Sequence, residues 1–233
     1  SDIDLHYAIK ANPMPAVVQH LCGLVDGFDV ASALEMNTAM DTPMPAGRIS
    51  FAGPGKTASE LSRAAAAGVV IHLESEREAE TLDGIAKTLG IRAPVAIRVN
   101  PDFELKSSGM KMGGGPKQFG IDAERVPDLL RRMAGMSLRF EGFHIFSGSQ
   151  NLRAETLQDA QSKTVALAIE LARHAPEPVR VLNIGGGFGI PYFPKDEPLD
   201  LAPVAETLGE LSVKARAALP EAQLIIELGR YLV

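Results

Sequence analysis

Three charged side chains lie late in short apolar segments of the chain. They are Lys10 in HYAIKANP, Asp29 in FDVAS and Arg98 in IRVNP. An isolated charge in such a place is costly, so each one needs a partner or a chemical task. A lysine in a partly desolvated site loses its proton readily, and a neutral amine condenses with an aldehyde to form an imine. The alternative for Lys10 is an exposed lysine at a strand end, which is the commoner situation.

Two segments have the composition of a phosphate cradle. NIGGGFG (183–189) holds three successive glycines, whose backbone N–H groups can approach an anion closely, and SGSQ (147–150) adds hydroxyl groups. The alternatives are a flexible turn for the first and a helix cap for the second. A dinucleotide site is disfavoured, because Ile190 stands where the GxGxxG pattern needs its third glycine.

The segment ELGR (227–230) carries a carboxylate and a guanidinium around one glycine. The planar fork of Arg230 suits a phosphate dianion, and Glu227 can accept a hydrogen bond from a protonated ring nitrogen. The alternative is a salt bridge between these two residues. His144 is interpreted more simply as a core histidine whose hydrogen bonds are satisfied. An amine for an aldehyde, a phosphate cradle and a carboxylate for a ring nitrogen together match pyridoxal 5'-phosphate.

The composition excludes several classes of function. A net charge of -6 leaves no basic surface for a nucleic acid, and no run of eighteen uncharged apolar residues is available to span a membrane. The single cysteine, Cys22, excludes an internal disulfide and a multi-cysteine metal site, so we expect no metal and a cytoplasmic location. The expected partner is a small molecule or another protein.

Short β-type segments alternate with longer helical patterns along the chain. The predicted strands are 5–11, 27–31, 48–53, 69–74, 95–100, 140–148, 179–187 and 223–233. The predicted helices are 14–24, 32–40, 58–67, 75–89, 123–134, 154–174 and 201–218. Thr57 with Glu60 and Ser75 with Glu78 have the spacing of capping boxes, which predicts where two of these helices begin.

Eight strands with seven intervening helices predict one α/β domain, a TIM-like (β/α)8 barrel over residues 1–233. An open doubly wound sheet is the alternative. The barrel is favoured because polar residues recur at the carboxyl ends of many strands, and in a barrel these ends converge on one mouth. The irregular segment 101–122 would overhang that mouth as a substrate-related loop, with a disordered excursion as the alternative.

The ordered motifs of the chain resemble those of the fold-type III pyridoxal-phosphate-dependent decarboxylases, the family of diaminopimelate, ornithine and arginine decarboxylases. The resemblance is greatest to the diaminopimelate branch. It rests on YAIKANP, FDVASALEM, FAGPGKT, RVNP, QFGID, GFHIFSGSQ, NIGGGFG and ELGRYLV, which occur in the family's order. It implies a barrel of the alanine racemase and ornithine decarboxylase type, with pyridoxal 5'-phosphate as the cofactor.

The resemblance also implies roles for individual residues. The catalytic residues would be Lys10, which forms the Schiff base, Asp29 beside it, and Glu227, which pairs with the pyridine nitrogen and keeps it protonated. The phosphate would be held by Ser149, Gly186, Gly187, Gly229 and Arg230. The cofactor site would be completed by Arg98, His144 and Phe146.

Glu227 separates two reactions of this fold. Alanine racemases resemble this barrel but pair the ring nitrogen with an arginine, which leaves the ring a weaker acceptor of electrons. A glutamate therefore favours the removal of a carboxylate from an amino acid, free or carrier-linked. A pyridoxal-phosphate-dependent racemase and a non-catalytic protein that binds this cofactor are the alternatives.

Two residues depart from the family's pattern. Phe146 stands where the family has a histidine that stacks on the cofactor, and Leu228 stands where it has a proline. These changes indicate a divergent branch, similar to decarboxylase homologues associated with exosortase gene clusters. The resemblance further implies an N-terminal segment and a C-terminal β-domain, both absent from this chain, and a homodimer of the full-length protein.

Overall fold

The computed structural model describes residues 2–103, 110–111 and 119–233. Eight parallel strands form a ring in the order β1, β2, β3, β4, β5, β8, β10 and β11. Pairing of β4 with β5 and of β11 with β1 closes the ring, so the structure is the predicted (β/α)8 barrel and not an open sheet.

The strands of the ring are β1 (Ile3–Ala8), β2 (Gly27–Val30), β3 (Ile49–Phe51), β4 (Val70–Leu73), β5 (Ala93–Asn100), β8 (Leu138–Ile145), β10 (Val181–Asn183) and β11 (Gln223–Leu228). Three two-residue strands of the described part of the chain lie outside the ring. Of these, β7 (Ile121–Asp122) pairs with β5, while β6 (Met110–Lys111) pairs antiparallel with β9 (Gly148–Ser149). The remainder of the predicted mouth loop, 104–109 and 112–118, lies outside the described residues.

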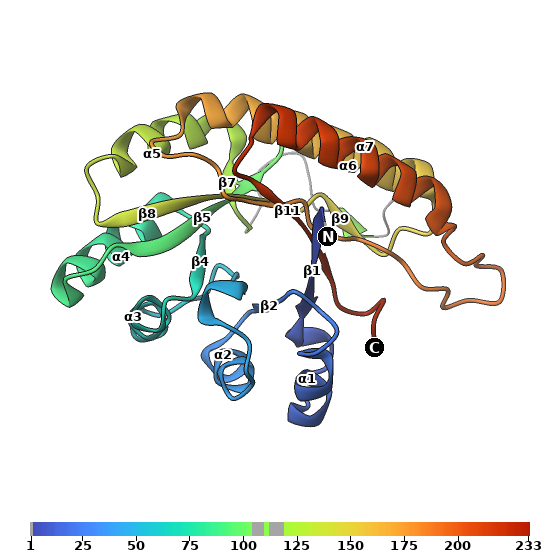
Figure 1. Cartoon of the computed structure of the whole chain (residues 1–233), viewed down its shortest axis with the longest axis horizontal. Coiled ribbons are helices and arrows are strands. Elements are labelled where there is room, and N and C mark those ends of the chain that lie inside the picture. Colours follow the sequence, from blue (N-terminus) through green and yellow to red (C-terminus); the bar gives the residue numbers. More distant parts are fainter. Residues whose placement is uncertain (1, 104–109, 112–118) are drawn as a thin grey trace.

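Among the described residues, seven α-helices surround the barrel, as predicted. They are α1 (Pro15–Leu21), α2 (Ala33–Met40), α3 (Ala58–Ala67), α4 (Glu76–Leu89), α5 (Val126–Met133), α6 (Ala154–Leu171) and α7 (Leu201–Ala218). The first four lie along one side of the ring, and the last three arch over the other (Figure 1). Within the described residues, no helix is both long and apolar enough to cross a bilayer.

The sequence extends most strands too far at their carboxyl ends. Residues 9–11 form a 3-10 helix after β1, and residues 184–187 follow β10 as a turn. Positive φ angles at Gly53 (113°) and Gly185 (69°) turn the backbone away from the sheet directly after two strands. Lys10, the glycines 185–187 and Arg230 therefore lie just beyond their strands. Asp29, Arg98 and Glu227 remain within β2, β5 and β11.

One of the two predicted capping boxes forms completely. The Thr57 hydroxyl accepts the N–H of Glu60, and the Glu60 carboxylate accepts the N–H of Thr57, at the start of α3. At α4, Ser75 accepts the N–H of Glu78, but the Glu78 carboxylate accepts the N–H of Glu74 instead (2.8 Å). The second box is therefore only half formed.

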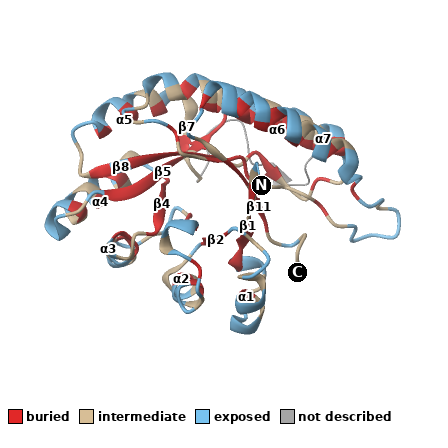
Figure 2. Cartoon of the chain, in the orientation of Figure 1, coloured by how far each residue is buried: buried red, intermediate tan, exposed pale blue. Residues whose placement is uncertain are grey.

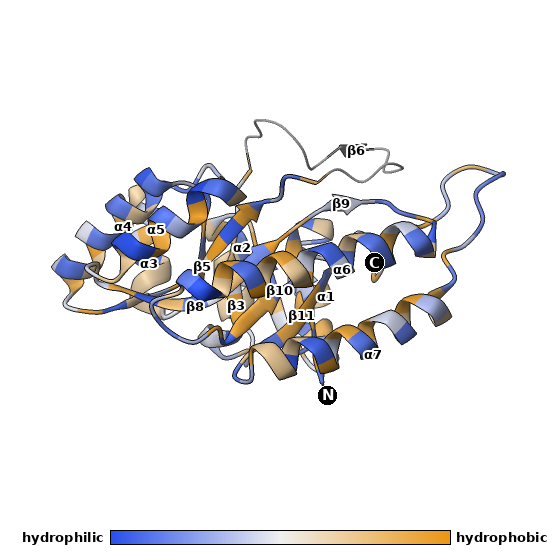
Figure 3. Ribbon diagram, turned by 90° about the horizontal axis from the view of Figure 1, so that it is seen from above, coloured by the Kyte–Doolittle hydropathy of each residue, from blue (hydrophilic) through white to orange (hydrophobic). Residues whose placement is uncertain are grey.

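Each strand turns an apolar side chain toward the helices and a polar one into the ring. The outward side chains, among them Tyr7, Phe28, Phe51 and Phe143, belong to one buried core. Figure 2 shows buried strands enclosed by helices with exposed outer faces, and Figure 3 shows hydrophobic and hydrophilic residues alternating along α6 and α7. The inward neighbours of these four side chains are His6, Asp29, Ser50 and His144, all buried. The barrel thus has an apolar outer layer and a polar interior.

Gly142 allows β8 to pass close to β10. Its φ angle is 152°, and a Cβ at this position would overlap the carbonyl oxygen of Val181. The register of β8 against β5 also shifts between Val95 and Ala96, next to Gly142. A side chain at position 142 would therefore push two neighbouring strands of the ring apart.

We expect Gly142→Ala to lower the free energy of unfolding by about 3 kcal/mol, because the added methyl group has no space and strains the backbone. Gly209→Ala is the matched control, since a Cβ at this position in α7 has nothing within 4 Å. The control should gain about 0.5 to 1 kcal/mol from helix propensity. Urea denaturation of both variants measures the difference, and equal changes would contradict the close approach of β8 to β10.

Candidate functional site

Lys10 lies at the carboxyl end of the barrel, just after β1. It occupies the short 3-10 helix Ile9–Ala11, and its side chain is 58% exposed. Its Nζ lies 3.7 Å from Oε1 of Glu227 and 4.0 Å from Oδ2 of Asp29. The structure therefore brings the three residues predicted as catalytic into one cluster.

The two carboxylates of this cluster come from the strands that flank β1 on either side. In the register of the sheet, Ala8 is level with Asp29 on β2, and His6 is level with Glu227 on β11. Both carboxylates are buried and point into the ring. The Ser50 hydroxyl donates to Asp29 Oδ1 (2.9 Å), and the Asn183 amide donates to Glu227 Oε2 (3.4 Å).

The charges of the cluster change the protonation that the sequence predicts for Lys10. Glu227, and after it Asp29, raise the pKa of the Lys10 amine, because both carboxylates favour the ammonium form. The prediction that Lys10 loses its proton readily is therefore wrong. Burial and the neighbouring Glu227 raise the pKa of Asp29 well above its usual value, which makes Asp29 a better proton acceptor than an exposed carboxylate.

His144 is not the satisfied core histidine that the sequence suggests. Its Nε2 lies 3.5 Å from Glu227 Oε2, yet neither ring nitrogen has a hydrogen-bond partner among the described residues. The His72 ring lies below it, with 4.5 Å between the ring centroids. Burial lowers the pKa of both imidazoles well below the usual value, so both rings are neutral at pH 7.

Arg98 is largely covered, with its side chain 11% exposed, and has the partner that the sequence predicts for it. Its Nη1 donates to Glu74 Oε1 (2.9 Å), and its guanidinium lies over the ring of Phe119, 4.9 Å from the centroid. The Glu74 carboxylate also accepts the backbone N–H groups of Gly53 and Gly120. Arg98 and Glu74 thus tie together the turns that follow three of the barrel strands.

A pocket of about 560 Å³ opens beside Lys10 at the carboxyl ends of the strands. Seven of the predicted site residues line it, namely Lys10, Phe146, Ser149, Gly187, Glu227, Gly229 and Arg230. Asp29 and His144 lie one contact behind this lining, against Lys10 and Glu227. Arg98 and Gly186 are not in the lining. A Cβ on Gly186 would overlap the carbonyl oxygen of Glu227, so this glycine permits the segment after β10 to pack closely against β11.

Arg230 carries a positive charge that no carboxylate neutralises within the part of the chain that the structure describes. Its Nη1 donates to the Gln150 amide oxygen (3.3 Å), and its guanidinium lies 5.6 Å from the centre of the Tyr192 ring. The alternative salt bridge between Arg230 and Glu227 is not formed, because Glu227 faces Lys10 and His144 instead.

Sequence reasoning missed several residues that position the site: Ser50, Glu74, Gln150, Asn183 and Tyr192. Ser50 and Asn183 are polar residues in apolar strands, the same signal that identified Asp29 and Arg98. No group of three metal-ligating His, Cys, Asp or Glu side chains is present among the described residues.

Comparison with known proteins shows what the chain resembles. Residues 1–233 match the family model described as "Pyridoxal-dependent decarboxylase, pyridoxal binding domain". L-glutamyl-[BtrI acyl-carrier protein] decarboxylase of Niallia circulans is 35% identical over 89% of this chain and 49% of its own length. Diaminopimelate decarboxylase of Aquifex aeolicus is 35% identical over 97% of this chain and 53% of its own. The chain thus spans about half the length of these relatives.

Solved structures agree with the sequence comparison. Diaminopimelate decarboxylase of M. jannaschii has a TM-score of 0.88 at 28% identity, over 99% of this chain and 54% of that one. The enzyme of Helicobacter pylori, solved with L-lysine, has a TM-score of 0.84 at 28% identity, over 98% of this chain and 57% of that one.

We expect Glu227→Gln to lower the pKa of the Lys10 amine, because the Glu227 carboxylate is the largest cause of its elevation. Between the lower pKa of the variant and the higher pKa of the parent, Lys10 should be charged in the parent and neutral in the variant. A pH titration of 13C-methylated lysines by NMR measures both values. Asp83→Asn, which removes the partner of exposed Lys87, is the control and should leave Lys10 unchanged. A Lys10 pKa that is the same in Glu227→Gln and parent would contradict this assignment.

Proposed function

Because this chain belongs to the pyridoxal-dependent decarboxylases, whose pyridoxal-binding domain its whole length matches, we propose that it binds pyridoxal 5'-phosphate through Lys10 and decarboxylates an amino acid. The observation that carries the proposal is the approach of Lys10 Nζ to Glu227 Oε1 (3.7 Å), in the same pocket as Arg230. An amine, a carboxylate and an unpaired guanidinium are the three groups that this cofactor requires.

The pocket suits the phosphate group of the cofactor. Ser149 offers a hydroxyl, Gly187 lines the same pocket with a positive φ angle of 80°, and Arg230 adds a cation. Glu227, which also lines the pocket, faces Lys10 and His144 and does not pair with Arg230, and donors that no carboxylate neutralises favour a dianion. We therefore propose that Ser149, Gly187, Gly229 and Arg230 hold the phosphate.

Glu227 is the proposed partner of the ring nitrogen. Its carboxylate is buried, and the Asn183 amide fixes its orientation. A buried carboxylate at this position favours a protonated ring nitrogen. When bound, pyridoxal phosphate supplies an aldehyde for an amine and a protonated ring that takes up the electron pair left by the departing carboxylate.

The neighbours of Lys10 prepare its amine for this chemistry. Lys10, whose pKa its carboxylate neighbours raise, is an ammonium ion and must lose a proton before it can act as a nucleophile. Asp29 Oδ2, 4.0 Å from Nζ and with a raised pKa, is placed to take that proton. Phe146 lines the pocket where the family has a histidine, and it offers an aromatic face without a proton.

The substrate that we propose is an amino acid, either free or attached to a carrier. One relative is named for a glutamyl carrier protein, and another for diaminopimelate. The homodimer and the cytoplasmic location expected from the sequence remain predictions.

Lys10→Ala should abolish the covalent attachment of pyridoxal 5'-phosphate, because the amine is removed. Borohydride reduction followed by mass spectrometry of the peptides locates the label, which is expected on the peptide that contains Lys10. Lys87→Ala removes an exposed lysine far along the chain and is the control. Specific labelling at another lysine in the parent protein would show that Lys10 is not the lysine that binds the cofactor.

The full-length protein should release CO2 from at least one member of a panel of amino acids, both free and carrier-linked. Glu227→Arg should reduce this release by at least about a hundredfold, because the ring then becomes a weaker acceptor of electrons. Incorporation of deuterium at Cα without CO2 would indicate a racemase. A labelled protein that converts no member of the panel would indicate a non-catalytic cofactor-binding protein.

A further inference from the structure

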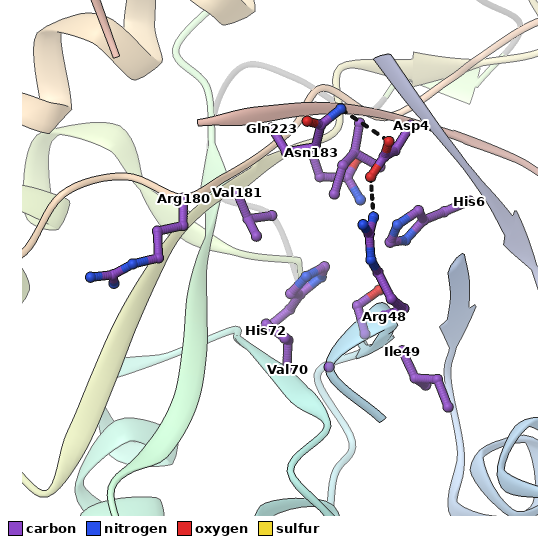
Figure 4. A pocket seen from close by; sticks show the side chains of 13 residues that line it. Asp4, His6, Arg48, Ile49, Val70, His72, Arg180, Val181, Asn183 and Gln223 are labelled. Carbon is purple, nitrogen blue, oxygen red and sulfur yellow. Dashed lines mark hydrogen bonds and ion pairs between the residues drawn. The ribbon is translucent and has the colours of Figure 1, made fainter. Parts of the chain in front are cut away.

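A second cavity lies inside the barrel, at the amino ends of the strands and opposite the Lys10 pocket. We call it the lower cavity; it has a volume of about 220 Å³, and side chains from β1, β3, β4, β10 and β11 line it. Figure 4 shows Asp4, His6, Arg48, His72, Asn183 and Gln223 gathered around it, whereas the guanidinium of Arg180 points away. The proposed reaction does not use these residues, Asn183 excepted.

The outer end of the lower cavity is closed by a polar network. Arg48 forms an ion pair with Asp4, and the Gln223 amide donates to Asp4 Oδ1 (3.0 Å). The Arg48 side chain is 51% exposed, so this network faces solvent. Arg48 and Asp4 neutralise each other, and neither forms a hydrogen bond with the polar groups deeper in the cavity.

Those inner groups are the imidazoles of His6 and His72. All four of their ring nitrogens are buried and lack a hydrogen-bond partner among the described residues. Burial lowers the pKa of His6 to about 4 and that of His72 well below its usual value, so each ring is neutral, with one donor and one acceptor. A buried polar group without a partner is costly, and a polar cavity of this volume has room for about seven waters.

The lower cavity and the carboxylate of Glu227 are joined by side chains that touch both. Asn183 lines the cavity and donates to Glu227 Oε2 (3.4 Å). His72 lines it as well, and its ring lies 4.5 Å from that of His144, whose Nε2 is 3.5 Å from Glu227. Two buried rings therefore fill the space between the cavity and the proposed partner of the ring nitrogen.

We propose that the lower cavity holds ordered waters, and that these waters together with His72 and His144 conduct protons between solvent at the amino end of the barrel and Glu227. The proton route rests on the proposed function, in which a bound cofactor covers the Lys10 side of the site. With that side covered, the lower cavity gives Glu227 a second connection to solvent.

Each transfer conserves protons. A cavity water gives a proton to one nitrogen of His72 and regains one from solvent. The two rings form no hydrogen bond with each other in the structure, so they must turn to bring a protonated nitrogen of His72 to an unprotonated nitrogen of His144 before the proton moves. His144 then passes a proton from its other nitrogen to Glu227, whose Oε2 lies 3.5 Å from Nε2. Both rings remain neutral overall and exchange tautomers. This fits their surroundings, because burial and the nearby charges of Lys56, Arg98 and Lys10 disfavour an imidazolium at either ring. At His72, the neighbouring His6 has the same effect.

The waters are tested by a crystal structure of the full-length protein at a resolution that shows ordered solvent. We expect waters within hydrogen-bond distance of the ring nitrogens of His6 and His72. A dry cavity in such a structure overturns the proposal. This measurement requires neither cofactor nor substrate, so its result is separate from the test of the proposed function.

The proton route is tested by a pH jump on the cofactor-loaded protein, with the absorbance of the bound cofactor as the readout. His72→Gln keeps a polar side chain but cannot accept and release a proton, and it should slow the relaxation by about tenfold. The spectra before and after the jump should match those of the parent protein. His20→Gln, at an exposed position on α1, is the control and should relax like the parent.

Val181→Phe is a second variant, which fills the lower cavity while all its histidines remain. It should slow the relaxation as well, so the proton route can still be tested if His72→Gln fails to fold. Unchanged relaxation in either folded variant, equal slowing in His20→Gln, or altered end-point spectra overturn the proton route. If the parent protein takes up no cofactor, the proposed function is wrong and the route falls with it, while the crystallographic waters still decide the content of the cavity.

Discussion

The site depends on two buried carboxylates that share one cation. Asp29 and Glu227 lie on either side of β1 and face the ammonium group of Lys10 at 4.0 and 3.7 Å. Without that cation, two negative charges would be buried close together in a medium that solvates them poorly. A ligand that reacts with the Lys10 amine must therefore preserve or replace this positive charge, while Ser50 and Asn183 hold the two carboxylates in position.

The barrel can hold such charges because its strands separate two kinds of packing. The outward side chains, such as Phe28 and Phe51, pack against helices and supply the hydrophobic stabilisation. The inward positions are thereby free to carry polar groups in layers, from the network of Asp4 and Arg48 to the cluster around Lys10. This division explains why segments such as VIHL combine a strongly apolar composition with a buried histidine.

The sequence was sufficient to predict the ring and its mouth, because parallel strands end on one side and their terminal residues must meet. It did not predict contacts between strands that lie far apart in the chain, such as those of Ser50 with Asp29 or Asn183 with Glu227. The protonation of Lys10 and the unpaired nitrogens of His144 also escaped prediction, since each depends on the distance to residues elsewhere in the ring. The predicted strand ends are too late because the apolar pattern of the sequence continues beyond each strand. The chain leaves the sheet earlier, at glycines with positive φ angles.

The antiparallel pairing of β6 with β9 has a consequence for how the protein can diverge. Met110 is paired with Ser149 and Lys111 with Gly148, so the backbone of β6 is paired directly with the proposed phosphate cradle. Insertions or deletions near β6 would shift this ladder and move the hydroxyl of Ser149 with it. Changes of length in this segment are therefore expected to be accompanied by compensating changes around β9.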